Sequence, residues 1–292
     1  MSTTEQLTPN QLSPAPHELE AIARILHDAT GIVITQGKSS MVQSRLSKRL
    51  RELGLSDYAT YIAHVTSESG VEERRAMISA LTTNVTRFFR ENHHFETLST
   101  AALPPLIARA RAGERIRLWS AGSSNGQEAY SIAMMIAEAA PDYAKLDLRI
   151  LASDIDPHMI AAGQAGLYDS STLASVPTEM QRKYFSRKGE KVQIATPLRE
   201  LISFRELNLH EQWPMRGRFD IIFCRNVVIY FDPDAQARLW QRFEAQLAPE
   251  GWLFVGHSER IADLSQSNLV TAGVTTYRLR AKTTTRENRK WH

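Results

Sequence analysis

Two patterns of apolar and polar positions divide the chain, and the first of them is helical. Between residues 17 and 80, apolar residues recur at the three- and four-residue spacing of amphipathic helices, and no strand-like alternation is present. Gly31 and Gly54 follow the first two periodic runs, where a helix would end. We therefore expect a small all-α domain. Its helices are predicted at residues 17–30, 39–53, 57–65 and 72–81.

The second pattern begins after about residue 81 and alternates strands with helices. Short apolar runs such as residues 219–224 (FDIIFC) are typical of strands that are buried on both faces. Amphipathic runs lie between them, and this order predicts an α/β domain with a doubly wound, mostly parallel sheet. Strands are predicted at residues 115–121, 146–153, 219–224 and 251–256, helices at 92–111, 128–140, 157–165 and 234–247, and a closing hairpin at 268–280.

Residues 172–206 do not fit this alternation. Within them, residues 191–196 and 201–205 alternate like short exposed strands, which predicts a small antiparallel β-subdomain inserted into the sheet domain. Residues 1–16 are rich in Ser, Thr, Pro and Gln, and we expect a mobile tail there. The expected division is a tail at residues 1–16, a helical domain at 17–80 and the α/β domain at 81–292.

The composition constrains location and partners. Hydrophobic residues make up 42% of the 292 residues, enough for a sizeable core, and the formal net charge of +3 does not indicate nucleic-acid binding. Cys224 is the single cysteine, so no disulfide can form within the chain, as in a reducing cytoplasm. No apolar run approaches the roughly 20 residues that cross a bilayer. We therefore expect a cytoplasmic protein that neither binds nucleic acid nor inserts into a membrane.

The turn after the first predicted sheet strand, within WSAGSSNGQEAYS at residues 119–131, has features of a ligand site. In doubly wound sheets ligands bind outside the carboxyl ends of the strands, and Gly122 and Gly126 would allow a close approach to the backbone. The lysine of a phosphate-binding loop is absent, and Glu128 suits a cationic or neutral adenosine ligand better than a phosphate. The alternative is a tight turn followed by an acid that the helix dipole favours.

An acidic segment, ASDID at residues 152–156, follows the second strand. Asp154 could accept hydrogen bonds from both hydroxyl groups of a ribose. Alternatively, Asp154 or Asp156 caps the helix that begins near residue 157. The two interpretations are compatible, with one acid on the ribose and the other at the cap.

The third strand, within FDIIFCRNVVIYFD at residues 219–232, delivers Arg225 and Asn226 to the same sheet edge. A buried arginine is costly unless it is paired. Arg225 is therefore expected either to pair with a carboxylate of the protein or to bind a carboxylate of the ligand. Tyr230 follows on a turn.

Residues 80–95 (ALTTNVTRFFRENHHF) on their own indicate only a helix junction. His93 and His94 are adjacent and cannot share one helix face, which argues against a metal pair. The sequence also lacks the spacing of Cys and His that binds zinc. We therefore predict no metal site.

Together these segments resemble the CheR family. LTTNVTRFFRE, WSAGSSNGQEAYS, ASDID, FDIIFCRNVVIYFD and LFVGHSE occur in the family's order and approximate spacing, and the resemblance covers about residues 17–280. It implies an N-terminal helical domain joined to a Rossmann-like methyltransferase domain with a β-subdomain insertion. It further implies S-adenosylmethionine as cofactor, with S-adenosylhomocysteine as its product. The acceptors it implies are glutamate side chains on the cytoplasmic helices of methyl-accepting chemotaxis receptors, which become methyl esters.

The resemblance also implies roles for individual residues. Arg90 should pair with the methionyl carboxylate of the cofactor, Asp154 with its ribose and Glu128 with its amino end. Tyr230 matches a tyrosine near the site of methyl transfer. Because the donor is a sulfonium and the acceptor is already an anion, catalysis would rest mainly on positioning. The family's cofactor-contacting positions match Asn84, Thr86, Arg90, Glu128, Asp154, Asn208, Leu209, Arg225 and Asn226.

A basic run lies on the second predicted helix and has two interpretations. Such a run is ordinarily a solvated surface, but in the family this helix is implicated in docking the acidic methylation helices of receptors, and we expect docking here. The run consists of Arg45, Lys48, Arg49 and Arg51.

One departure from the family concerns receptor tethering. Some members grip a C-terminal receptor pentapeptide through a glycine-rich loop, whereas the corresponding loop here, residues 186–191 (SRKGEK), has a single glycine, Gly189. We therefore expect no dependence on a pentapeptide tether. Two other functions stay open: a small-molecule O-methyltransferase, against which the basic helical domain argues, and a non-catalytic adaptor, against which the intact cofactor positions argue.

Overall fold

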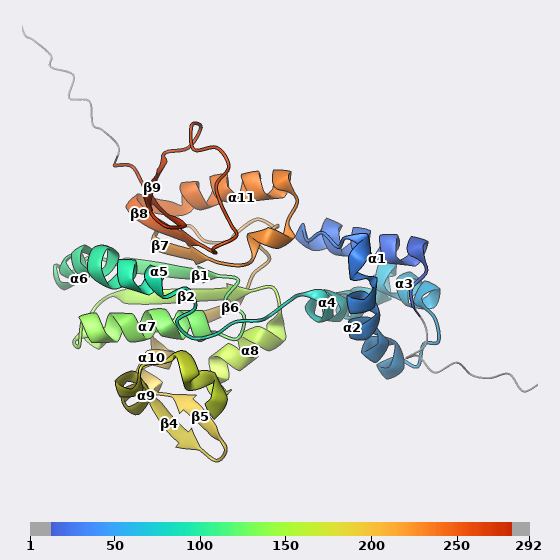
Figure 1. The fold of residues 1–292 in the computed structure, drawn as a ribbon, viewed down its shortest axis with the longest axis horizontal. Helices are drawn as coiled ribbons and strands as arrows, with labels where there is room; N and C mark the ends of the chain where they lie inside the picture. Colours follow the sequence, from blue (N-terminus) through green and yellow to red (C-terminus); the bar gives the residue numbers. More distant parts are fainter. Residues whose placement is uncertain (1–12, 282–292) are drawn as a thin grey trace, which may run out of the picture.

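The computed structural model describes residues 13–281, and its N-terminal part is all-α, as predicted (Figure 1). The four α-helices of this part pack their apolar stripes around a core that includes Leu26, Leu46, Tyr61 and Met77. Residues 1–12 of the predicted tail lie outside the described residues. The elements are α1 (Pro16–Thr30), a 3₁₀ turn η2 (Gln36–Lys38), α2 (Ser39–Glu52), α3 (Tyr58–Thr66), a 3₁₀ turn η3 (Glu68–Gly70) and α4 (Val71–Leu81).

The rest of the described chain is built on a seven-stranded sheet in the order β6-β2-β1-β7-β8-β10-β9. The first five strands in this order are parallel and the last two pair antiparallel, which confirms the predicted doubly wound, mostly parallel sheet. The strands are β1 (Ile116–Ala121), β2 (Leu148–Asp154), β6 (Ile202–Glu206), β7 (Phe219–Cys224), β8 (Leu247–Val255), β9 (Leu269–Gly273) and β10 (Thr276–Leu279).

Helices cover both faces of this sheet, so its central strands have no exposed face. In β7, Ile221 and Phe223 pack with one apolar cluster, while Ile222 packs with the other. The first cluster includes side chains from α6 (Leu103–Arg111), α7 (Gln127–Ala139) and α8 (Pro157–Ala165), and the second includes α11 (Pro233–Gln246). Burial on both faces explains the continuous apolar run that marked this strand in the sequence.

The predicted helix at residues 92–111 is interrupted. It consists of α5 (Asn92–Thr97), a π-helical turn (Leu98–Ala102) and α6, which has a proline in its first turn. Proline is tolerated there because the first amides of a helix have no intrahelical acceptor. The interruption keeps both halves buried against the sheet, since Phe95 and Leu106 belong to the same apolar cluster.

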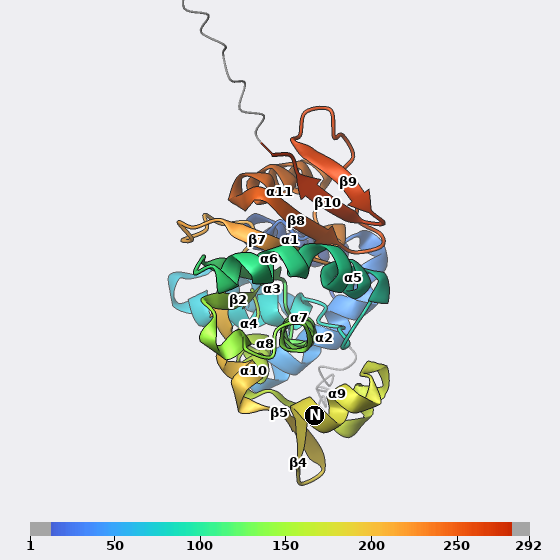
Figure 2. The same cartoon turned by 90° about the vertical axis from the view of Figure 1, so that its left-hand side faces the viewer.

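The β-subdomain exists, but its strands differ from those predicted. It is an antiparallel sheet in the order β3-β5-β4, formed by Leu167–Asp169, Lys191–Ile194 and Phe185–Lys188. Figure 2 shows the hairpin of β4 and β5 projecting from the body of the molecule. Two short helices, α9 (Thr178–Tyr184) and α10 (Thr196–Glu200), flank it in the sequence.

The second strand predicted for this insertion, at residues 201–205, was assigned to the wrong sheet. Ile202–Glu206 is the parallel edge strand β6 of the main sheet. Ile202 and Phe204 are buried, whereas Ser203 and Arg205 are exposed. An edge strand that is covered on one face alternates in the same way as an exposed antiparallel strand, so the pattern alone could not distinguish them. No helix of the described residues is long and apolar enough to cross a membrane.

Candidate functional site

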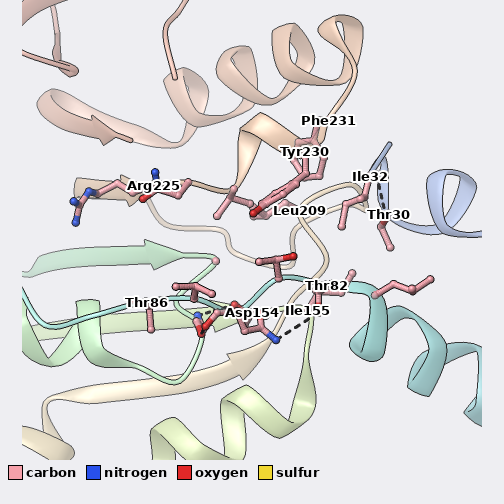
Figure 3. Close-up of a pocket in the computed structure, with 18 of the residues that line it drawn as sticks. Thr30, Ile32, Thr82, Thr86, Asp154, Ile155, Leu209, Arg225, Tyr230 and Phe231 are labelled. Atoms are coloured by element: carbon pink, nitrogen blue, oxygen red, sulfur yellow. Dashed lines mark hydrogen bonds between the residues drawn. The ribbon is translucent and has the colours of Figure 1, made fainter. Parts of the chain in front are cut away.

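A pocket lies between the carboxyl-terminal edge of the sheet and the N-terminal helices (Figure 3). Its lining comes from the turns after β1, β2 and β7, from the linker after α4, and from the segment between α1 and α2. In Figure 3, Tyr230 and Asp154 lie on opposite sides of the pocket. This is the sheet edge at which the sequence predicted a ligand.

The turn after β1 brings the backbone close to the pocket. Gly122 lines the pocket with φ 75°, and a Cβ atom there would lie 2.3 Å from Cγ2 of Val227. A side chain at this position would therefore meet both a steric clash and the left-handed backbone strain that glycine avoids. The amide of Ser124, in the same turn, donates to Asp154 at 2.7 Å.

Of the two roles that the sequence left open, capping belongs to Asp156. Asp156 caps α8 by accepting from the amide of His158 at 2.9 Å, and it also accepts from the side chain of Asn84. Asp154 is buried and lines the pocket, and burial raises its pKa to about 6. Asp154 is thus the acid that is available to a ligand, while Asp156 fixes the helix and the linker.

Glu128 and Arg225 form a buried ion pair at the inner end of the pocket. Nη1 of Arg225 lies 3.1 Å from Oε2 of Glu128, and the hydroxyl of Ser120 donates to Oε1 at 2.7 Å. Burial raises the pKa of Glu128 while the nearby Arg225 charge opposes that shift. Arg225, only 2% exposed in its side chain, therefore pairs with a carboxylate of the protein, the first of its two predicted alternatives.

Glu91 completes this network and was missed in the sequence. Its Oε2 lies 3.3 Å from Nη2 of Arg225, and Arg225 also donates to the carbonyl of Arg90. Glu91 has φ 58°, a left-handed backbone conformation just before α5 that no pattern in the sequence indicated. Arg225 thus joins the linker to the helix that carries Glu128.

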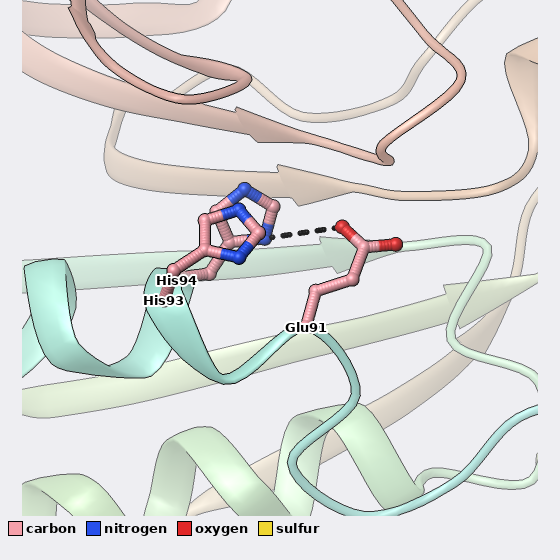
Figure 4. Close-up of side chains that lie close together, drawn as sticks. All are labelled: Glu91, His93 and His94. Atoms are coloured by element: carbon pink, nitrogen blue, oxygen red, sulfur yellow. Dashed lines mark ion pairs between the residues drawn. The ribbon is translucent and has the colours of Figure 1, made fainter.

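Glu91, His93 and His94 bring three possible metal-ligand atoms within 4.8 Å of one another (Figure 4). The ring centroids of the two histidines lie 4.1 Å apart. The prediction that adjacent residues point to different helix faces therefore does not hold at the start of α5. Burial lowers the pKa of His94 to about 3, so that this ring is neutral. The guanidinium of Arg225 already neutralises Glu91, which leaves little charge there for a cation.

The other predicted cofactor positions separate into two groups. Asn208 does not line the pocket; its side-chain amide donates to the carbonyl of Ala29 at 2.7 Å and so holds the end of α1. The buried Oδ1 of Asn226, which does line the pocket, has no hydrogen-bond partner among the described residues. The predicted site residues that do line the pocket are Asn84, Thr86, Arg90, Glu128, Asp154, Leu209, Arg225, Asn226 and Tyr230.

The helical domain contributes a wall of the pocket that the sequence did not predict. Ile32 forms an antiparallel bridge with Phe231, and the amide of Val33 donates to the carbonyl of Tyr230 at 2.8 Å. His27 of α1 lies 3.0 Å from Asp232, the N-cap of α11. These contacts place Thr30, Ile32, Val33, Ile34, Lys38 and Met41 along the pocket.

Comparison with known proteins identifies the family. The family described as "CheR methyltransferase, SAM binding domain" matches residues 84–277, and "CheR methyltransferase, all-alpha domain" matches residues 17–82. The chain belongs to the CheR methyltransferase family. Its domain of residues 84–277 is accordingly an S-adenosylmethionine-binding methyltransferase domain, which confirms the predicted cofactor.

Relatives with curated descriptions match most of the chain. A "Probable chemotaxis protein methyltransferase" of Rhizobium etli is 48% identical over 262 residues, which cover 88% of this chain and 98% of the relative. Chemotaxis protein methyltransferase 2 of Pseudomonas aeruginosa is 39% identical, and the match covers 85% of this chain and 88% of the relative. The chemotaxis protein methyltransferase of Escherichia coli is 39% identical, and the match covers 88% of this chain and 89% of the relative.

The residues of this CheR pocket fit S-adenosylmethionine chemically. The acid of Asp154 suits a ribose diol, the turn at Gly122 permits close approach, and Asn226 offers a free carbonyl oxygen. When bound, the cofactor supplies an activated methyl group on a cationic sulfur. Of the two carboxylates that line the pocket, Glu128 is paired with Arg225, whereas Asp154 has no cationic partner among the described residues.

The basic run of α2 separates into two pairs. Arg45 donates to the carbonyls of Ala80, Leu81 and Thr82, and Arg49 pairs with the buried Glu73. Both therefore hold α2 against α4. Lys48, with 74% of its side chain exposed, and the exposed Arg51 project from the domain.

Proposed function

We propose that this CheR-type chain transfers a methyl group from S-adenosylmethionine to glutamate side-chain carboxylates of methyl-accepting chemotaxis receptors. The products would be glutamate methyl esters, and the enzyme a cytoplasmic protein-glutamate O-methyltransferase. Its relatives are described as chemotaxis protein methyltransferases, which supports both the reaction class and the sensory pathway.

The observation that carries the proposal is the composition of the pocket. Its carboxylates lie at the sheet edge, Asp154 buried and Glu128 half-buried and paired with Arg225, whereas the lining also includes the half-buried Lys38 and the exposed Val33 and Val85. A site that binds a cationic cofactor inside and presents apolar and basic side chains outside suits an acidic protein surface as acceptor. A small acceptor would instead require an enclosed pocket.

Arg90 and Tyr230 are the proposed residues at the reacting groups. Arg90 is partly buried and donates through Nη1 to the carbonyl of Val85 at 3.1 Å, which orients its guanidinium at the pocket. Its other nitrogens would then hold the methionyl carboxylate. Tyr230 lines the opposite part of the pocket, and its backbone is fixed by Val33. Both residues would act mainly by positioning, because the acceptor is already ionised at neutral pH.

The assignment of Arg90 has a direct test. Arg90→Ala should weaken cofactor binding by roughly tenfold or more, the contribution of a charge-assisted hydrogen bond. Isothermal titration calorimetry with S-adenosylhomocysteine would measure it. Arg115→Ala, a change in an exposed arginine that precedes β1 at the far end of the strands, serves as the control. Unchanged affinity in the Arg90 variant would overturn this role.

For receptor docking we propose the exposed side of α2. Lys48 and Arg51 are one helical turn apart and both are exposed, which supports contact with the acidic side of a receptor helix. Arg45 and Arg49 lie beside them and would add to the positive potential while holding the domain together.

The proposed docking includes no pentapeptide tether. β4 and β5 are joined by only Gly189 and Glu190, and the tip of this hairpin carries Lys188 and Lys191. A two-residue connection has little backbone with which to enclose a peptide. Isothermal titration of a free receptor-type C-terminal pentapeptide should show no binding; tight binding would contradict this part of the proposal.

Transfer of a labelled methyl group tests the function as a whole. Purified full-length protein is incubated with labelled S-adenosylmethionine and cytoplasmic fragments of chemotaxis receptors, and the protein product is then treated with mild alkali. A carboxyl ester releases labelled methanol, whereas a methylated amine or ether does not. Label that stays on the receptor after alkali, or transfer only to small molecules, would overturn the proposal. The same fragments with Gln in place of the acceptor Glu residues are the control.

A further inference from the structure

A lysine from the helical domain lies beside Tyr230 in the pocket. Lys38, the last residue of η2, places Nζ 5.6 Å from the centroid of the Tyr230 ring. It lines the pocket together with Tyr230 and is half-buried there. A cation at this distance from an aromatic face is attracted to it, so the Tyr230 ring helps to hold the ammonium group in place.

The ammonium group of Lys38 has no counter-charge in the part of the chain that the structure describes. Among the side chains that the structure describes, Lys38 has no ion pair and no hydrogen bond. The other cations of the lining differ: the buried Arg225 pairs with Glu128 and Glu91, Arg90 donates to the carbonyl of Val85 and is assigned above to the cofactor, and Arg87 is exposed. Among the described residues, Lys38 is therefore a half-buried cation of the pocket that is left for an acceptor anion once Arg90 holds the cofactor.

Exposed apolar side chains belong to the pocket lining or lie next to it in the sequence. Val33 and Val85 line the pocket and are 36% and 79% exposed, and Ile229, next to Tyr230, is 43% exposed. A protein segment that covers these residues would exclude water from Lys38. Excluding water strengthens the attraction between the ammonium group and a carboxylate. The arrangement suits a single acid flanked by apolar residues, as on an amphipathic acidic helix.

We propose that Lys38 binds the acceptor carboxylate and makes the enzyme select glutamate over its neutral amide counterpart. The proposal rests on the proposed function, since it takes a glutamate carboxylate as the acceptor. An ammonium group can donate to one oxygen of the carboxylate and leave the other free to react. The helical domain would thus take part in acceptor selection at the pocket itself, separately from docking through Lys48 and Arg51.

The effect on rate has a defined direction. Methyl transfer removes the negative charge of the acceptor, so Lys38 holds the acceptor more tightly before the reaction than in its transition state. Loss of Lys38 should therefore raise KM for the receptor fragment by about tenfold and leave kcat unchanged or higher. A residue that only supported the fold would instead lower kcat, cofactor affinity and stability together.

Binding measurements separate this role from others. Affinity for receptor fragments with Glu or with Gln at the acceptor site is measured in the presence of S-adenosylhomocysteine, by titration calorimetry, for wild type, Lys38→Met and Lys38→Arg. Wild type should bind the Glu fragment about tenfold more tightly than the Gln fragment. Lys38→Met should abolish this preference, and Lys38→Arg should retain most of it. Lys145→Met, a change in an exposed lysine of the 3₁₀ turn η5 (Tyr143–Lys145) before β2, controls for net charge.

Three results would overturn the assignment. These are an unchanged Glu-over-Gln preference in Lys38→Met, a loss of S-adenosylhomocysteine affinity in that variant, and a fall in kcat with KM unchanged. Failure of the proposed function looks different, because wild-type protein would then release no labelled methanol from receptor fragments. The two failures are therefore distinguishable in the same set of samples.

Discussion

The two walls of the pocket differ in how firmly they are held. The sheet-edge wall consists of buried polar side chains whose hydrogen bonds lie mostly within the protein, such as Ser120 to Glu128 and the amides of Ser124 and Asp156 to Asp154. The helical wall presents the exposed Val33, the half-buried Ile32, Ile34 and Met41, and Lys38, which has no ion pair among the described residues. We infer that the first wall is organised before its ligand arrives, while the second is completed by a partner.

This difference matches the two ligands of the proposed reaction. The cofactor is the same in every turnover and gains from a site that is already formed, because little ordering is then lost on binding. The acceptor is a site on another protein that must enter and leave. Disturbing the sheet-edge wall should therefore affect stability and cofactor affinity, and disturbing the helical wall should affect the acceptor.

The largest effect is expected at Arg225. Arg225→Met would leave Glu128 and Glu91 without their buried counter-charge and should lower the free energy of unfolding by about 3–5 kcal/mol. Urea denaturation followed by circular dichroism measures this. The double variant Arg225→Met/Glu128→Gln should recover part of the loss. Arg111→Met, which removes one partner of an exposed ion pair, is the control and should change little. An Arg225 variant as stable as this control would show that the wall is not held by charge.

At Asp154 we expect a loss of cofactor affinity rather than of folding. Asp154→Asn should weaken binding by roughly 100-fold, because a ribose diol would lose a charged acceptor of two hydrogen bonds. Burial raises the pKa of Asp154 to about 6, and only the ionised form accepts both bonds. Affinity in the wild type should therefore fall about tenfold per pH unit as the pH drops below 6.

The pH dependence supplies its own control. In Asp154→Asn the affinity should be weak but nearly independent of pH between 5 and 7, because the titrating group is gone. Calorimetric titration with S-adenosylhomocysteine at several pH values distinguishes the two curves. If the variant kept the wild-type slope, another group, such as the buried Glu128, would be responsible.

The contrast between the walls also explains what the sequence could reveal. Asp154, Glu128 and Arg225 were found because parallel strands end at one edge, so residues after successive strands must meet there. Lys38 and Val33 were missed because their position depends on how the two domains dock. That docking is fixed by isolated contacts such as Asn208 to Ala29, which leave no periodic pattern. Edge strand β6 was misassigned for a similar reason, since its alternation is set by what covers it.

The basic helix α2 offers a test within one element. Lys48→Glu/Arg51→Glu should lower kcat/KM for receptor fragments by about tenfold, through slower association, and leave cofactor affinity unchanged. Arg45→Gln should instead reduce stability, because Arg45 donates to three carbonyls at the end of α4. Methylation rates at low and high salt, with thermal unfolding in parallel, separate the two. If both variants changed methylation rate and thermal stability alike, the distinction between docking and structural basic residues of α2 would be wrong.

The smallest effect is expected where the walls are joined. The hydrogen bond to Asp232 raises the pKa of His27, with a smaller contribution from Asp28. A raised pKa in the folded state means that the pair stabilises the protein below the ordinary histidine pKa of 6.5 and stops doing so as the pH rises through the folded value. Because His27 is nearly half exposed, His27→Asn should cost at most about 1 kcal/mol at pH 6 and almost nothing at pH 8.5. Urea unfolding of both proteins at the two pH values gives the difference. If His27→Asn lowered the free energy of unfolding equally at both pH values, the ion pair would not join the domains. The Ile32–Phe231 bridge and packing would then join them, and the helical wall would be more firmly held than its exposed side chains indicate.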